Sequence, residues 1–155
     1  MILTVELSLK VNDETETLLQ EYGKLMRHEI YKVVGVFQKQ GQIFNLPYRV
    51  ISRQLDPSAR HLVMKQAKLL YEKRCTNPDI KPDFSSIWSS RSCRMENHSL
   101  LFKLDSKEPG HQQRLIPFST VDHSEAVLSM GKVIDVTLKQ QESAWFAYVR
   151  INTDR

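Results

Sequence analysis

The sequence predicts an α+β fold in which a small antiparallel β-barrel carries a helical lobe inserted after its first strand. Apolar and polar side chains alternate over residues 1–11, and helical periodicity follows over residues 13–39 and 57–75. Only short strand-like runs occur after that. Because a lone N-terminal strand needs partners, we expect residues 1–11 and 85–155 to form the barrel and the intervening residues 12–84 to form the helical lobe.

The first strand and the first helix have clear boundaries in the sequence. In the first eleven residues, Ile2 or Leu3 and then the odd positions up to Val11 are apolar and alternate with polar residues, which is typical of a half-buried strand. Asn12 then offers a helix cap, and the acidic residues after it suit the positive end of a helix. Apolar side chains recur at helical spacing until Gly41, which ends the helix. Glu29 interrupts this stripe, and we expect it at one edge of the apolar face.

A second helix begins after a break in the pattern. Pro47 favours a short helix of its own, and Asp56 followed by Pro57 is typical of a helix start. We expect this helix to run from Pro57 to about Cys75. The prolines and polar residues of 76–84 predict a loop.

The C-terminal half predicts strands separated by turn residues. The expected strands are Arg91–Met95, Ser99–Leu104, Gln113–Phe118, Val133–Lys139 and Ala144–Asn152. The last two form a hairpin in which Val133, Asp135, Thr137 and Lys139 face the strand that carries Trp145, Ala147, Val149 and Ile151. Residues 122–130 predict one short helix, capped by Asp122.

Composition limits the class of protein. The 155 residues carry a formal net charge of +4, with 26% charged and 41% hydrophobic side chains, which is ordinary for a folded domain. No apolar run is long enough for a membrane span, and the N-terminus does not resemble a signal peptide. Cys75 and Cys93 are too few for a disulfide scaffold. We therefore expect a cytoplasmic protein in a reducing compartment.

A search for catalytic motifs is negative. The five histidines are scattered, and no CxxC, HExxH, GxSxG or glycine-rich phosphate loop occurs. The carboxylates Asp105, Asp122 and Asp135 fall at turns or on strand faces, where no metal-binding pair can be assigned. We expect no metal, no cofactor and no catalytic residue. A small metal-dependent phosphodiesterase, built by groups that only folding brings together, stays an alternative.

The positive charge is concentrated in one stretch of the sequence. Residues 47–75 have a net charge of +5, whereas residues 1–46 have −1 and residues 76–155 have zero. Cations interleaved with aromatic side chains favour a polyanion, so we predict a nucleic-acid-binding site. Its members are Tyr48, Arg49, Arg53, Arg60, Lys65 and Lys68. The alternatives are a solvated helix face and, for Tyr48, packing beneath the helical lobe.

A serine- and arginine-rich run follows, SSIWSSRSCR. Arginine and serine hydroxyls suit a sugar–phosphate backbone, so Arg91 and Arg94 join the predicted site, and Trp88 is the candidate for stacking on a base. Alternatively, Trp88 anchors this segment to the barrel.

The order of these segments resembles a known family. An N-terminal strand leads into the EYGKLMRHEIYKVV helix, a second helix and the run SSIWSSRSCRMENHSLLFKL. Then come RLIPFST, GKVIDVTL and SAWFAYVRI, in which Ile116-Pro117-Phe118 and the later Trp145, Phe146 and Val149 are the most suggestive matches. The chain resembles the N-terminal part of the TnpB (OrfB) proteins of bacterial insertion sequences, which are related to compact type V CRISPR nucleases.

The resemblance implies a function in mobile genetic elements. In that family, the strands build a wedge-type barrel and the helices form an inserted recognition lobe. The chain would bind guide RNA and target DNA. It would not be an enzyme by itself, because the family's G-[IV]-D segment and zinc ribbon of the nuclease half are absent from these residues. A protein-interaction or dimerisation module, built on the long helix, is the remaining alternative.

Overall fold

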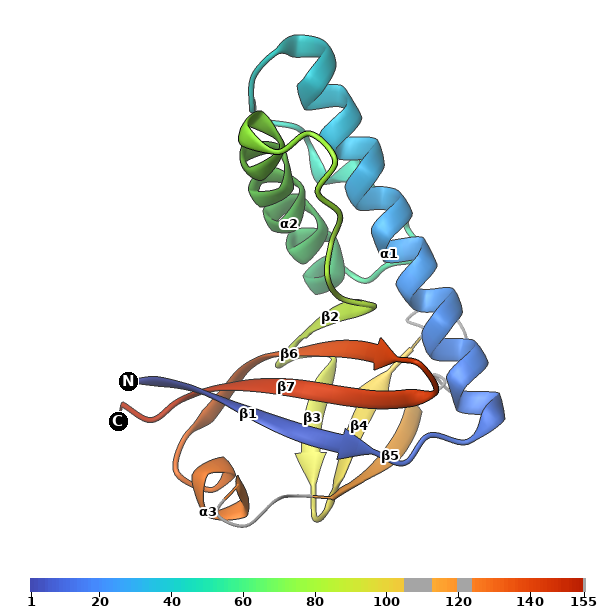
Figure 1. The fold of residues 1–155 in the computed structure, drawn as a ribbon, viewed down its shortest axis with the longest axis vertical. Coiled ribbons are helices and arrows are strands. Elements are labelled where there is room, and N and C mark those ends of the chain that lie inside the picture. The colour runs from blue at the N-terminus through green and yellow to red at the C-terminus, as the bar shows by residue number, and fades with distance from the viewer. Residues whose placement is uncertain (105–112, 120–123, 155) are drawn as a thin grey trace.

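The structure is a computed structural model that describes residues 1–104, 113–119 and 124–154. Helices α1 and α2 stand together on one side of a strongly curled sheet, and the short helix α3 lies near its other end (Figure 1). The elements in chain order are β1 (Ile2–Leu9), α1 (Asp13–Gln40), the 3₁₀ helix η1 (Tyr48–Val50), α2 (Pro57–Thr76), β2 (Ser86–Ser89), β3 (Cys93–Glu96), β4 (Ser99–Lys103), β5 (Gln113–Ser119), α3 (Ser124–Leu128), β6 (Lys132–Gln141) and β7 (Ala144–Asn152).

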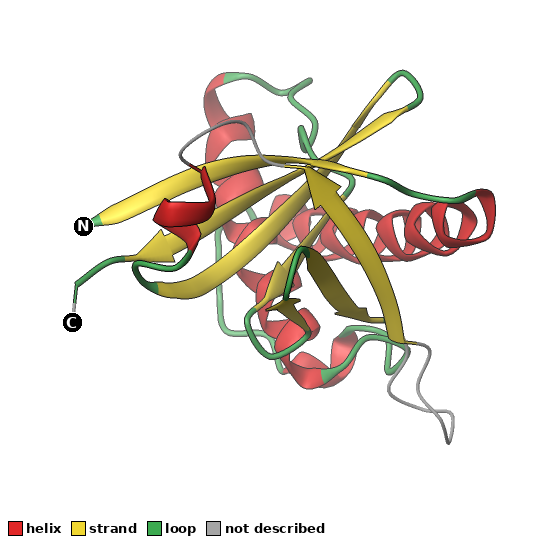
Figure 2. Cartoon of the chain, turned by 90° about the horizontal axis from the view of Figure 1, so that it is seen from below, coloured by secondary structure: helices red, strands yellow, loops and turns green. Residues whose placement is uncertain are grey.

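The seven strands form one antiparallel sheet in the order β2-β6-β7-β1-β5-β4-β3. The sheet curls around its core, as the view from below shows (Figure 2). Within the described residues β2 and β3 each pair with one strand, so the sheet is a half-barrel with two edges. The predicted α+β class and antiparallel sheet are confirmed, whereas closure into a complete barrel is not seen.

Strand β1 lies in the middle of this sheet. It pairs with β7 from Ile2↔Asn152 to Leu9↔Trp145, and only its last two residues pair with β5. The prediction that the first strand finds its partners in the C-terminal half is therefore confirmed. The alternation of the sequence is also confirmed, since Val5, Leu7 and Leu9 are buried.

Helix α1 begins and ends where the sequence predicts. The Asn12 side chain accepts a hydrogen bond from the Thr15 amide at 2.8 Å, and Gly41 closes the helix with φ of 74°. Midway along the helix, Gly23 permits a close approach to the segment that leads into β2. A Cβ there would lie only 2.7 Å from the carbonyl oxygen of Ser85, so a larger residue would push α1 away from this segment.

The buried side chains fall into two clusters. One lies inside the curled sheet and includes Trp88, Phe102 and Leu19 of α1. The other lies between α1 and α2 and extends to Ile87 of β2. The apolar stripe of α1 is thus covered within the chain, by α2 over one part of its length and by the sheet over the other.

Two details of the sheet differ from the sequence-based expectation. Ser86–Ser89 is a strand, although its serines favour a loop, because it pairs with β6 from Ser86↔Leu138 to Ser89↔Asp135. The buried Ser86 hydroxyl accepts a hydrogen bond from the Trp88 indole at 2.8 Å. In the final hairpin, Val133 faces Ile151 as expected. A β-bulge then shifts the register, so that Asp135 lies opposite Arg150.

The other expected elements agree with the structure to within a few residues. The short helix expected in 122–130 is present as α3, whereas its expected cap, Asp122, lies outside the described residues. In the described part of the chain, no helix combines the length and the apolar character needed to cross a membrane.

Candidate nucleic-acid interface

Helix α2 carries part of the predicted site on one face. His61, Lys65 and Lys68 recur at the spacing that places side chains on the same side of a helix. The Tyr48 hydroxyl lies 2.9 Å from the His61 Nδ1 atom, so η1 is attached to this face. Next to it, Arg49 is exposed. We call Tyr48, Arg49, Arg53, Lys65 and Lys68 the η1–α2 surface.

Tyr48 is partly exposed and partly packed against α2. The residue is 44% exposed, and its ring meets the His61 ring edge-on with 5.9 Å between the ring centroids. Beside it, Tyr48, Met64 and Lys68 line a shallow depression with a volume of about 290 Å³. The ring is therefore anchored by one edge to α2 while much of its surface stays open to a ligand.

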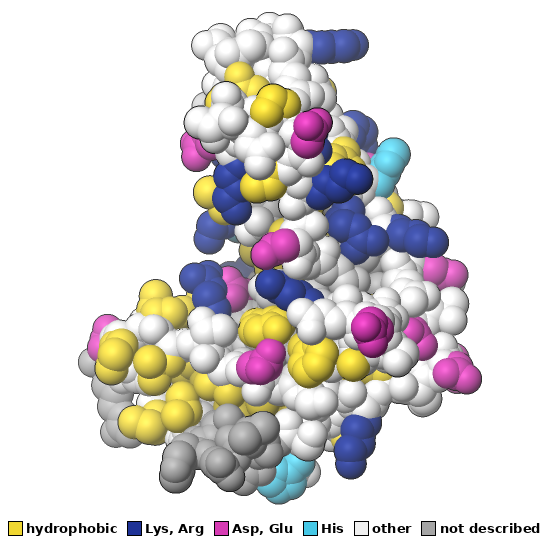
Figure 3. All heavy atoms as spheres, viewed as in Figure 1, with side chains coloured by type: hydrophobic (Ala, Val, Ile, Leu, Met, Phe, Trp, Pro, Cys, Tyr) yellow, Lys and Arg dark blue, Asp and Glu magenta, His cyan; other side chains and the backbone are white. Residues whose placement is uncertain are grey.

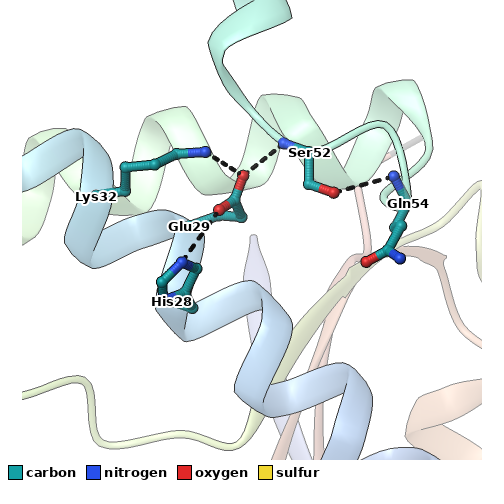
Figure 4. Close-up of polar contacts among 5 residues, drawn as sticks. All are labelled: His28, Glu29, Lys32, Ser52 and Gln54. Carbon is teal, nitrogen blue, oxygen red and sulfur yellow. Dashed lines mark hydrogen bonds and ion pairs between the residues drawn. The ribbon is translucent and has the colours of Figure 1, made fainter.

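A buried carboxylate holds the segment that presents this tyrosine. Glu29 of α1 is only 2% exposed, and one of its oxygens accepts hydrogen bonds from the Ser52 amide at 2.5 Å and from the Lys32 ammonium at 2.7 Å (Figure 4). The Ser52 hydroxyl in turn accepts a bond from the Gln54 amide at 3.2 Å. Glu29 therefore lies at one edge of the apolar stripe of α1, as expected, but this edge is buried against the η1 connector, residues 41–56.

The remaining cations of the predicted basic stretch differ in exposure. Arg53 is exposed in the turn before α2. Arg60 is half-buried, and its Nε atom is buried without a hydrogen-bond partner among the described residues. Only part of the Arg60 guanidinium is therefore open to a phosphate.

Trp88 cannot stack on a base in this structure. It is fully buried, and its ring stacks on Tyr22 with centroids 4.1 Å apart and meets the edge of Phe102 at 5.0 Å. The alternative interpretation, that Trp88 anchors its segment to the sheet, is confirmed, because the indole packs in the core of the sheet. The sequence around Trp88 could not show this, because the tyrosine that covers the indole comes from α1.

Arg91 and Arg94 belong to the β2–β3 region of the sheet and not to helices α1 and α2. Arg91 is exposed in the turn after β2, and Arg94 of β3 forms an ion pair with Glu96 at 2.9 Å. The structure does not join these two arginines to the η1–α2 surface.

A larger hollow lies where the helical pair meets the sheet. This junction cleft has a volume of about 510 Å³. One wall comes from α2 and from the connector 77–85, and the other from the outward-facing side chains of β1, β6 and β7. Figure 3 shows lysine and arginine side chains around this level of the molecule, with acidic and hydrophobic side chains beside them.

The junction cleft has an excess of positive charge. Its lining contains four cations, Lys73, Lys81, Lys139 and Arg150, against the single carboxylate of Asp83. Two of the cations have acidic partners. Lys139 lies 3.3 Å from Asp83, and Arg150 donates two hydrogen bonds to Asp135. Neither Lys73 nor Lys81 forms an ion pair with any residue that the structure describes, so both charges are free to meet an anion.

Hydrogen bonds hold two polar side chains of the sheet wall in place. Bonding to Asp135 raises the pKa of Arg150, which keeps the guanidinium charged. Tyr148 donates to Glu6 at 2.7 Å, and this bond raises the pKa of its hydroxyl, which stays neutral. The Lys139 ammonium lies 5.0 Å from the centre of the Tyr148 ring. This wall is therefore polar, cationic and held in place.

A second depression lies on the other side of the same connector. It has a volume of about 470 Å³ and shares Asp83, Phe84 and Lys139 with the junction cleft. It adds Lys24 and Arg27 of α1, and Arg27 donates to the Ser85 carbonyl at 2.6 Å. Cations thus flank both sides of the connector.

None of the nine residues predicted from sequence lines the junction cleft. Lys139 and Arg150 were missed because their segment has no net charge. The sequence nevertheless contained a signal for them. Lys139 and Arg150 occupy polar positions that alternate with apolar ones on two consecutive strands, and such positions share one face of a sheet.

The described residues contain no group of three or more histidine, cysteine or acidic side chains that could hold a metal ion. Asp105 and Asp122 lie outside the described residues, and Asp135 is engaged by Arg150. No family model matches the chain, and no curated protein matches it either.

Proposed function

We propose that this chain is a nucleic-acid-binding module that holds a polynucleotide at the junction cleft and the η1–α2 surface. The observation that carries the proposal is the cleft, in which four cations face one carboxylate beside exposed apolar side chains. Phosphates require long cationic side chains on a rigid support, and helices and paired strands supply that support here.

The η1–α2 surface adds to this support. Lys65 and Lys68 extend from α2, the helix that also carries Lys73 into the cleft. Tyr48 presents a partly exposed ring beside them, as proteins that bind single strands often do. A polynucleotide that follows α2 would meet cations on both sides of this helix.

A narrower proposal follows from the sequence resemblance. The module would be the wedge-type barrel and inserted recognition lobe of a TnpB-like, RNA-guided nuclease, binding guide RNA and target DNA. Its support is the order of strand, helical pair and strands, together with Ile116-Pro117-Phe118 and Trp145. A G-[IV]-D segment encoded just downstream in the genome would support it, and unrelated sequence there would contradict it.

Salt-dependent binding tests the wider proposal. Affinity for RNA or DNA, followed by fluorescence anisotropy, should fall with a log–log slope of about −0.7 to −0.9 for each neutralised phosphate. Arg53→Ala and Lys73→Ala should each reduce the slope by about 1. Lys103→Ala removes an exposed cation from β4, outside both surfaces, and should leave the slope unchanged.

Two other outcomes would replace the proposal. Hydrolysis of a phosphodiester by the isolated chain with Mg²⁺ would favour the phosphodiesterase. Dimerisation that is indifferent to nucleic acid, together with no measurable binding of RNA or DNA, would favour the interaction module. The structure offers the latter little apolar surface on α1, because its buried residues pack within the chain.

A further inference from the structure

The two walls of the junction cleft differ in chemistry. Leu69 of α2 and Phe84 of the connector give one wall an apolar surface, and Leu69 is 40% exposed although it is a large hydrophobic residue. The opposite wall presents Thr137, Tyr148 and Arg150. The cleft is therefore amphipathic, with an apolar side and a cationic, hydrogen-bonding side.

The charge distribution limits the class of ligand. Lys73 lies one helical turn after Leu69 on the same face of α2, and Lys81 lies on the connector that contains Phe84. Both unpaired cations thus line the same cleft as these apolar side chains. A ligand in which flat apolar groups alternate with negative charges over short distances would satisfy both kinds of side chain.

An unpaired polynucleotide strand has this chemistry, and a duplex does not. In a duplex the bases stack on one another, so that the outer surface offers mainly phosphates and sugars to an apolar wall. In a single strand each base has a free face that can lie against an apolar or aromatic side chain. The apolar wall therefore distinguishes between the two forms of nucleic acid.

We propose that the junction cleft binds an unpaired nucleotide of a single strand, with its base against Leu69 and Phe84 and its flanking phosphates at Lys73 and Lys81. This inference rests on the proposed function and adds the form of nucleic acid that the cleft accepts. Tyr148 and Arg150 face the base edge from the sheet, where the hydroxyl and guanidinium are held by Glu6 and Asp135.

The experiment compares ligands that differ in one property at a time. Anisotropy titrations use a single-stranded oligonucleotide, as RNA and as DNA, its duplex, an abasic strand of the same length, and polyglutamate. The abasic strand keeps the phosphates and lacks the bases. The wild-type protein should bind the complete strand at least about fivefold more tightly than the abasic strand, the loss expected for one unstacked base.

Variants then locate this preference. Leu69→Ala is at an exposed helical position that tolerates alanine, and it should remove most of the difference between complete and abasic strands. Leu115→Ala changes an exposed leucine on β5, outside the cleft, and should keep the difference. Phe84→Leu preserves apolar volume but removes the ring, and it should weaken only the strands that carry bases.

Lys73→Ala separates charge from base recognition. It should weaken complete and abasic strands by the same factor and reduce the salt slope by about 1. Circular dichroism melting curves of every variant identify any change that comes from unfolding.

The outcomes distinguish this inference from the proposed function. Equal affinity for single strand, duplex and abasic strand, unchanged in Leu69→Ala, would overturn the inference and leave nucleic-acid binding standing. Polyglutamate that binds as tightly as the oligonucleotide would make an acidic polypeptide the occupant. If no nucleic acid binds at all, the proposed function itself fails.

Discussion

Removal of the Glu29 carboxylate should destabilise the protein and loosen the η1 connector. In Glu29→Ala, the Ser52 amide loses its acceptor, and Lys32 loses the charge that it pairs with. Nothing else in the described residues accepts from the Ser52 amide. The substitution therefore tests whether a buried charge on α1 positions the segment that carries Tyr48.

The size of the effect follows from the two contacts. A hydrogen bond to a charged acceptor contributes about 1.5–3 kcal/mol. The ion pair adds less than about 1 kcal/mol, because Lys32 is partly solvated. The free energy of unfolding should thus fall by about 3 kcal/mol in Glu29→Ala, which lowers the melting temperature by roughly 6–12 °C for a chain of this size. Glu29→Gln keeps an acceptor and should cost only about 1 kcal/mol.

Urea unfolding gives the free energies, and hydrogen exchange at the Ser52 amide gives the local effect. Glu21→Ala removes an exposed carboxylate from the same helix and should change stability by less than about 0.5 kcal/mol. The reasoning would be refuted if the free energy of unfolding of Glu29→Ala equalled that of Glu21→Ala. It would also be refuted if the Ser52 amide exchanged at the same rate in Glu29→Ala and in the wild-type protein.

Three further predictions concern single side chains. Trp88→Ala should cost about 3–5 kcal/mol of stability and leave the salt dependence of binding unchanged, since the indole is buried; an altered salt slope in the folded variant would contradict this. A thiol reagent at mildly alkaline pH should modify Cys75 rapidly and Cys93 only on unfolding, because burial raises the pKa of the Cys93 thiol; two fast thiols would be the contrary result. The hydroxyl of Tyr148 has its pKa raised by the bond to Glu6, so this bond stabilises the fold at neutral pH and is lost as the pH rises above the ordinary value of 10.0 and through the folded-state value. Tyr148→Phe should flatten that alkaline loss in pH-dependent melting curves, and an identical profile would count against the bond.

Most of the elements could be predicted because their signals are local. The cap at Asn12, the αL glycine at position 41 and the Asp56-Pro57 start depend on neighbours in sequence, and the structure has all three. Strand β2 was missed for the opposite reason. Ser86 is polar, and its buried hydroxyl is satisfied by the indole of Trp88, which itself stacks on Tyr22 of α1.

The candidate site was harder to predict than the fold. The cations of the η1–α2 surface could be predicted as a candidate site because they are close together in sequence. The junction cleft instead joins Lys73 of α2 to Lys139 and Arg150, which are distant in the chain. Likewise, a one-residue bulge decides that Asp135 meets Arg150, and nothing in the alternation of the strand predicts where a bulge falls.

The central position of β1 has a consequence for the order of folding. Ile2 is synthesised well before its partner Asn152, which belongs to the last described strand. Pairings of such large sequence separation form slowly, because a long loop must close first. Helices α1 and α2 have their own apolar cluster and follow each other in sequence, so they can pack while the chain is still growing. Until β7 arrives, β1 presents an unpaired edge with Val5, Leu7 and Leu9 uncovered, and at this stage the nascent protein is most exposed to aggregation.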